Sequence, residues 1–234
     1  MAALFLLIAF GGFTPTYWAP VAEGRFHSPP IVHIHGFLLF SWVLFYFIQT
    51  ALVAAGRTPT HRAWGLAGIS LFSVMVCSIL VTKVTLMRLD DAGGFGEPSL
   101  QFSLVAIGAL PLMIGFFVAA IANVRRPELH KRFMFTLMCG LMIPALARVF
   151  LTLFAPPGAT AGAPPPAFVA LPPAIVGCLL MVVGMAHDWR TRGRPHKVYV
   201  IGFTLTLATF LLIPPLSKSA AWLHIAQGLR SLGG

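Results

Sequence analysis

A short pattern of basic residues and histidine occurs three times along this chain. In each copy an arginine is followed four positions later by histidine and then directly by a second base, and each copy contains a proline. The copies are Arg57/His61/Arg62 with Pro59, Arg126/His130/Lys131 with Pro127, and Arg192/His196/Lys197 with Pro195. Imidazole is a common ligand of haem iron and of metal ions. His61, His130 and His196 are therefore candidate cofactor ligands, with a plain interfacial role as the alternative.

A second group of polar residues interrupts the apolar runs themselves. His35 lies near the start of one run, Lys83 near the end of the next, and Arg148 about 15 residues into a later one, well inside a membrane at about 1.5 Å per residue. A charge in hydrocarbon is costly and is retained for a function or a partner. Together with His33 and Arg88, these three residues place two imidazoles and up to three cations near one level of the membrane, with no carboxylate in these runs. Such a cluster predicts a site for an anion: a carboxylate substrate, a lipid phosphate or the propionates of a haem. Lys83 and Arg88 are also close enough to the surface to snorkel or to pair with Asp90 or Asp91.

The sequence His33-x-His35 is a candidate metal site. Two residues turn a helix by about 200°, so both rings reach one ion only if the helix begins after His33. His35, the deeper of the two, is the preferred ligand. Gly36 beside it allows a neighbouring helix or a flat cofactor to approach closely.

The elements that must position these residues are membrane helices. The chain is 58% hydrophobic and 9% charged, whereas about 25% of the residues of a soluble domain are charged. We expect an all-α, polytopic helix bundle forming a single membrane domain, 1–234, with three repeated hairpins as one description of it. The predicted helices are 2–18, 31–55, 63–84, 100–124, 133–154, 168–187 and 198–216, followed by an amphipathic tail, 217–234.

The distribution of Lys and Arg predicts the orientation. The links 56–62, 125–132 and 188–197 carry 2, 4 and 4 bases, and they all fall on one side of a seven-helix topology. By the positive-inside rule this side is cytoplasmic, which places the N-terminus inside and the C-terminus outside. The bases predict anionic lipid headgroups as partners and no nucleic acid, because they form short links instead of a continuous basic face. The first apolar run lacks a preceding base, which favours a retained helix over a signal peptide.

Several of these residues also carry a resemblance. The chain resembles a family of uncharacterised bacterial multi-helix inner-membrane proteins from about Gly12 onward. The resemblance implies a helix bundle in the bacterial inner membrane and no particular activity. It rests on His35-Gly36, Trp42, Gln49, Gly56-Arg57, His61-Arg62, Gly65, His130-Lys131-Arg132-Phe133-Met134, Pro144 and Arg148.

The functional assignment stays open between several alternatives. Histidines at helix ends are distantly similar to those of diheme b-type membrane cytochromes, which implies haem b held by His35 or by His61, His130 and His196, in an oxidoreductase or electron carrier. A cofactor-free protein that binds or transports a small anion or lipid is the main alternative. A metal-dependent membrane enzyme is a third, and a structural role is a fourth. Whether the protein is an enzyme is not decided by these patterns.

Overall fold

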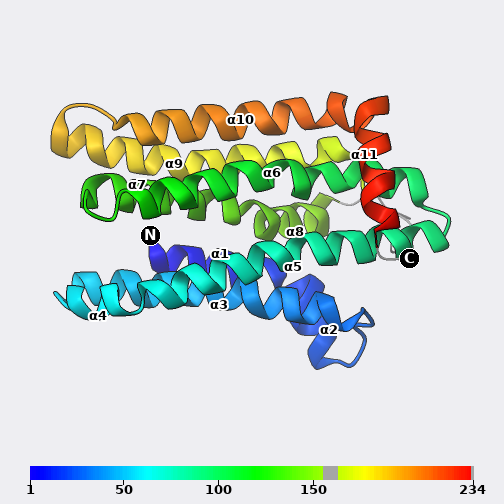
Figure 1. Ribbon diagram of the computed structural model, residues 1–234, viewed down its shortest axis with the longest axis horizontal. Helices are drawn as coiled ribbons and strands as arrows, with labels where there is room; N and C mark the ends of the chain where they lie inside the picture. The colour runs from blue at the N-terminus through cyan, green and yellow to red at the C-terminus, as the bar shows by residue number, and fades with distance from the viewer. Residues whose placement is uncertain (155–162, 233–234) are drawn as a thin grey trace.

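The computed structural model describes residues 1–154 and 163–232. Within them the regular structure is helical, and seven segments are long and apolar enough to cross a membrane. The chain is therefore an all-α, multi-pass membrane protein, as predicted (Figure 1). A bilayer core of about 30 Å requires about 20 residues of helix, because backbone groups in hydrocarbon must bond within the segment.

The spans follow the predicted order, and several of them consist of more than one helical element. The first consists of α1 (Ala2–Phe13), the π-helical turn η1 (Thr14–Trp18) and α2 (Ala19–Ala22); then come α3 (Pro30–Ala54), the link helix α4 (Thr58–Ala63), α5 (Gly65–Ala92), α6 (Gly96–Ala122), α7 (Pro127–Leu141) with α8 (Ile143–Phe154), η2 (Ala167–Ala170) with α9 (Leu171–Arg192), α10 (Lys197–Ser217) and α11 (Ala220–Ser231). Two breaks contain proline, Pro15 in η1 and Pro144 at the start of α8, because proline lacks an N–H and clashes with the preceding turn.

One predicted boundary is wrong in a way that affects the site. Helix α9 continues past residue 187 to Arg192 and ends at Gly193, which has φ +73° and stops the helix in the left-handed conformation. Asp188 is therefore inside a membrane-spanning helix, where it is buried. The expectation that no carboxylate lies within a span is incorrect.

The helices form two layers that pack face to face. One layer contains α1, α3 and α5, and the other contains α6 to α10 (Figure 1). Between them the rings of Phe72 and Phe117 stack at 3.7 Å, and Trp42 meets Phe117 edge-on at 5.8 Å. Helices α1 and α8 approach so closely that a Cβ on Gly12 would lie 2.6 Å from the carbonyl oxygen of Ala145. Such small residues allow membrane helices to pack tightly.

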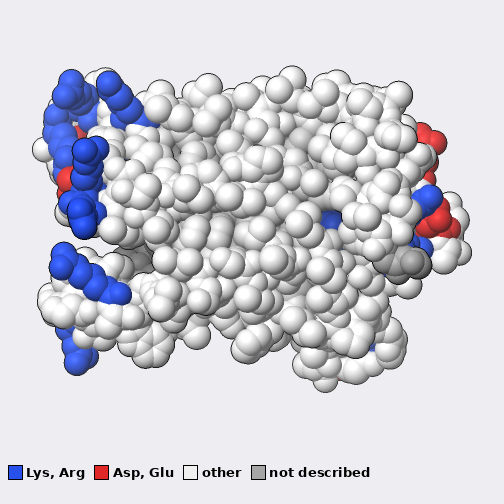
Figure 2. Space-filling model, viewed as in Figure 1, with Lys and Arg blue, Asp and Glu red and all other residues white. Residues whose placement is uncertain are grey.

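The surface separates into an apolar middle and two charged ends. Figure 2 shows Lys and Arg gathered at the end formed by the links 56–62, 125–132 and 188–197, which we call the basic end. Acidic residues gather at the opposite end, and the middle is apolar. The membrane-spanning helices expose apolar side chains such as Leu7, Phe37 and Leu66. The N-terminus lies toward the basic end, and α11 lies at the opposite end (Figure 1).

Helix α11 is docked on the bundle. It crosses the ends of α5 and α6 (Figure 1). The Nε of Arg88 donates to the carbonyl oxygen of Arg230 at 2.9 Å, and the indole N–H of Trp222 donates to that of Leu100 at 2.8 Å. Arg230 also forms an ion pair with Asp91. The predicted amphipathic tail therefore contacts protein on one face instead of lying alone in the membrane interface.

The three link copies share their local structure only in part. In the first two, the arginine precedes a helix as its N-cap, and its carbonyl accepts the histidine N–H at 3.1 Å for Arg57 and His61 and at 3.0 Å for Arg126 and His130. In the third copy the histidine, His196, is itself the N-cap of α10. The first two links are thus equivalent, and three identical hairpins are not confirmed.

Candidate functional site

A cavity of about 420 Å³ lies between the two layers, in the half of the bundle away from the basic end. Most of its wall is apolar, with Phe13, Leu39, Phe102 and Leu141 among the lining residues. The polar groups that line it are few, and three of them are His35, Lys83 and Arg148. The structure therefore brings together, from α3, α5 and α8, three of the five residues that the sequence placed at one level of the membrane. The other two, His33 and Arg88, do not line the cavity.

Lys83 and Arg148 both contact aromatic rings in this wall. The Nζ of Lys83 lies 5.2 Å from the ring centre of Phe102, and the guanidinium of Arg148 lies 5.7 Å from that of Phe13. These distances are within cation–π range, which partly offsets the loss of hydration. The side chain of Arg148 keeps accessible surface and lines the cavity.

No Asp or Glu side chain forms an ion pair with either cation. All six acidic side chains lie within the described residues, and each has another partner: Glu23 with Arg25, Asp90 with Ser99, Asp91 with Arg230, Glu97 with Gln101, Glu128 with Lys131, Arg132 and Arg192, and Asp188 with Arg132. The charge of Lys83 acts on both His35 and Arg148, and the charge of Asp90 opposes it. The polar end of the cavity therefore carries a positive potential.

His35 is held by a neighbour on α5. Its Nδ1 lies 3.0 Å from the hydroxyl of Ser78, and that hydroxyl donates to the carbonyl of Met75 at 2.7 Å. The other ring nitrogen, Nε2, stays accessible and has no partner among residues 1–154 and 163–232. His35 thus presents one nitrogen to the cavity, as the predicted role in ligand binding requires.

His33 lies apart from the cavity. Its Nδ1 bonds to the hydroxyl of Tyr17 at 3.0 Å, and its ring packs against Phe26. The two histidines of the His33-x-His35 pair therefore point to different partners and are not brought together as ligands of one ion. In the described part of the chain, no three His, Cys, Asp or Glu side chains gather closely enough to hold a metal.

His61 and His130 meet at the basic end. Their ring centres are 6.2 Å apart, with the planes at 69°. The Nδ1 of His130 lies 2.9 Å from the carbonyl oxygen of Ala120 and donates to it, which leaves Nε2 unprotonated in the neutral ring. The Nδ1 of His61 is buried without a partner among the described residues. Burial lowers the pKa of His61, and the neighbouring His130 and Arg62 lower it further.

His196 has a different role. Its Nδ1 accepts the backbone N–H of Val198 at 3.2 Å and so caps the first turn of α10. Burial lowers the pKa of His196, and the positive charge of Arg132 adds to this effect while Asp188 opposes it. His196, which the sequence pattern grouped with His61 and His130, thus uses its Nδ1 in a structural hydrogen bond.

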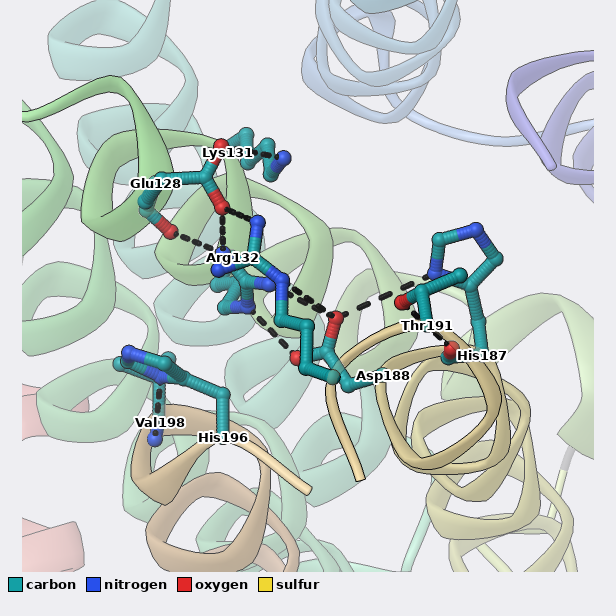
Figure 3. Close-up of polar contacts among 9 residues, drawn as sticks. Glu128, Lys131, Arg132, His187, Asp188, Thr191, His196 and Val198 are labelled. Carbon is teal, nitrogen blue, oxygen red and sulfur yellow. Dashed lines mark hydrogen bonds and ion pairs between the residues drawn. The ribbon is translucent and has the colours of Figure 1, made fainter. Parts of the chain in front are cut away.

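A buried ionic network beside His196 was missed by the sequence analysis (Figure 3). The Nε and Nη2 of Arg132 donate to the two carboxylate oxygens of Asp188 at 2.8 and 2.7 Å. Its Nη1 donates to the carbonyl and the carboxylate of Glu128 at 2.7 and 2.6 Å, and Arg192 also pairs with Glu128. Arg132 is 1% exposed. The glycine at 193, a standard helix stop, was the signal that would have extended α9 and revealed Asp188.

A polar recess adjoins this network, lined by Arg132, Asp188, Arg192 and Tyr199 among others. Its charges already pair with one another, so the recess has less need of a charged ligand than the cavity has.

Comparisons with protein-family models, with curated proteins and with solved structures found no match for this chain.

Proposed function

We propose that this protein binds an amphiphilic anion within the membrane, with the apolar part of the ligand in the cavity and its anionic head between Lys83 and Arg148. One observation carries the proposal: two cations face an apolar cavity while every carboxylate side chain of the protein is engaged elsewhere. A cation in such surroundings is costly unless a counter-charge is supplied. Bound ligand would supply it.

The size and position of the cavity agree with this function. Ligand pockets are typically about 300 to 1,000 Å³ and mainly apolar, with a few polar groups that fix orientation; this cavity has 420 Å³ and that composition. Arginine and lysine are the usual partners of carboxylate and phosphate heads. If the basic end faces the cytoplasm, the cavity serves the outer half of the bilayer.

Equilibrium binding to the full chain in neutral detergent tests the proposal. The probes share one dodecyl chain: dodecanoate and dodecyl phosphate as anions, dodecanol and dodecylamine as neutral and cationic controls. We expect the anions to bind and the controls to bind at least about tenfold more weakly, because one charge-assisted contact contributes about 1.5 to 3 kcal/mol. Lys83→Met and Arg148→Met should each weaken anion binding by a similar factor.

The matched control is Arg62→Met, which removes one exposed positive charge at the basic end. Anion binding should be unchanged in this variant, because Arg62 does not line the cavity. Equal binding of dodecanoate and dodecanol to the unaltered protein would contradict the proposal. So would a loss of anion binding in Arg62→Met as large as in Arg148→Met.

A second function, electron transfer through haem b, is favoured by one specific observation. His61 and His130 face each other from two helices with ring centres 6.2 Å apart, and metal–nitrogen bonds of about 2 Å on each side fit that separation. The bond from Nδ1 of His130 to Ala120 is the support that a ligating imidazole usually has. Haem would supply one-electron chemistry, and the two imidazoles would hold its iron.

The haem alternative is tested by absorption spectroscopy of protein expressed with added haem. A Soret band that shifts on reduction, and that is lost in His61→Ala and in His130→Ala, is the expected result. His196→Asn is the control and should keep the band, because His196 is occupied by its capping bond. A colourless preparation, or a band that survives both substitutions, would exclude a haem held by this pair.

A further inference from the structure

The protons around His35 can be assigned from two hydrogen bonds. Ser78 has a single hydroxyl hydrogen, which it donates to the carbonyl of Met75 at 2.7 Å. Its oxygen can therefore only accept at the 3.0 Å contact with Nδ1 of His35, so Nδ1 carries a hydrogen. In the neutral ring, Nε2 then has a lone pair and no hydrogen. Nε2 of His35 is therefore a hydrogen-bond acceptor at the cavity.

The charges nearby favour the neutral ring. Lys83 and Arg148 already place two positive charges at the polar end of the cavity, and an imidazolium would add a third in apolar surroundings. The site therefore combines two cationic donors with one acceptor. A fully ionised carboxylate has no hydrogen, so it would satisfy Lys83 and Arg148 and leave Nε2 of His35 unpaired. A polar group that a ligand covers without bonding to it loses its hydration, which weakens binding.

On the basis of the proposed function, we infer that the head of the ligand is a phosphate monoester that carries its own hydroxyl, on a single apolar chain. A monoprotonated phosphate has three terminal oxygens. The two oxygens that share its single negative charge accept from Lys83 and Arg148, and the third donates its hydrogen to Nε2 of His35. Such monoesters lose their second proton near pH 6, so the monoprotonated form is well populated at and below that pH.

A further hydroxyl at the same place agrees with a phosphate head. Thr82 lines the cavity beside Lys83, is 4% exposed, and its Oγ1 has no hydrogen-bond partner among residues 1–154 and 163–232. Threonine hydroxyls both donate and accept. A head with several oxygens offers more partners to such a group than a carboxylate does.

Two probes test whether the hydroxyl of the phosphate head contributes to binding. Dodecyl phosphate at pH 6 and dodecyl methyl phosphate have the same chain and the same phosphorus centre, and the methyl diester is a monoanion without an O–H. We expect the full chain in neutral detergent to bind the monoester at least about tenfold more tightly than the diester. His35→Phe should bring this ratio close to one, and His33→Phe, whose ring lies outside the cavity, should leave it unchanged.

The outcomes separate this inference from the proposed function. Equal binding of the two phosphates to the unaltered protein, or a ratio that persists in His35→Phe, would overturn the phosphate monoester and leave a simpler anion. Dodecanoate binding to His35→Phe verifies that the variant retains a folded cavity. Inorganic phosphate in thousandfold excess should not displace dodecyl phosphate; displacement would overturn the lipid-like source in favour of free phosphate. Failure of every anion to bind would instead reject the proposed function itself.

Discussion

Arg132 and Arg148 lie on the same membrane span, yet their surroundings are opposite. Arg132 donates to Asp188 and Glu128 and lies over the ring of Tyr199 at 5.8 Å, so its charge is fully matched by the protein. Arg148 has an aromatic contact, an open cavity beside it and no carboxylate partner. The difference indicates that the first arginine holds the bundle together and that the second is available to a molecule from outside.

The largest effect is expected from breaking the matched pair. Arg132→Met or Asp188→Leu alone leaves the other charge buried and should lower the free energy of unfolding by about 3 to 5 kcal/mol. The double variant Arg132→Met/Asp188→Leu should be closer to the unaltered protein than either single variant. Denaturant unfolding in detergent micelles measures all three. Additive losses in the double variant would show that the two residues are not coupled.

Arg148→Met should act in the opposite direction on stability. The substitution removes a cation without a counter-charge from an apolar cavity, so the free energy of unfolding should stay the same or rise by up to about 2 kcal/mol. Ligand binding should be lost at the same time, which is the usual relation between stability and function at a binding site. A loss of stability as large as that of Arg132→Met would remove the contrast between the two arginines.

The smallest effect concerns His196 and its dependence on pH. The neutral ring caps α10, and its pKa in the folded protein is lowered by burial. Because the unfolded chain then binds a proton more readily, stability should fall as the pH drops through the unfolded value of about 6.5. His196→Asn keeps a cap that cannot titrate. Between pH 7.5 and 5.5 it should lose less stability than the unaltered protein; equal slopes would contradict this role.

The sequence was sufficient to predict the helices and to predict that His35, Lys83 and Arg148, which form the polar end of the cavity, lie at one level. A charge such as Arg148 within an apolar run is informative by itself, because hydrocarbon penalises it wherever it lies. The contacts at the basic end depend on residues distant in sequence, such as Arg132 and Asp188, and charge alone does not distinguish a buried pair from two solvated residues. An acidic residue at a helix end therefore gave no sign of burial.

The link pattern shows how a repeat can mislead. Its three histidines share one offset from an arginine, but the proline positions differ: two residues before His61, three before His130 and directly before His196. A proline disfavours helix in the residue before it, so α10 begins only after Pro195, and His196 becomes a cap. The first two histidines lie inside a helical turn and are free to face each other.

The docking of α11 has a consequence for the order in which the protein assembles during synthesis. Membrane helices leave the ribosome in sequence, so the hairpin of α5 and α6 is complete long before Trp222 and Arg230 emerge to bond with Leu100 and Arg88. Until then these ends are held together by the short turn 93–95 and by the bond from Ser99 to Asp90. A segment that is translated later thus docks on a part of the bundle made much earlier, so α5 and α6 can pair before α11 is added.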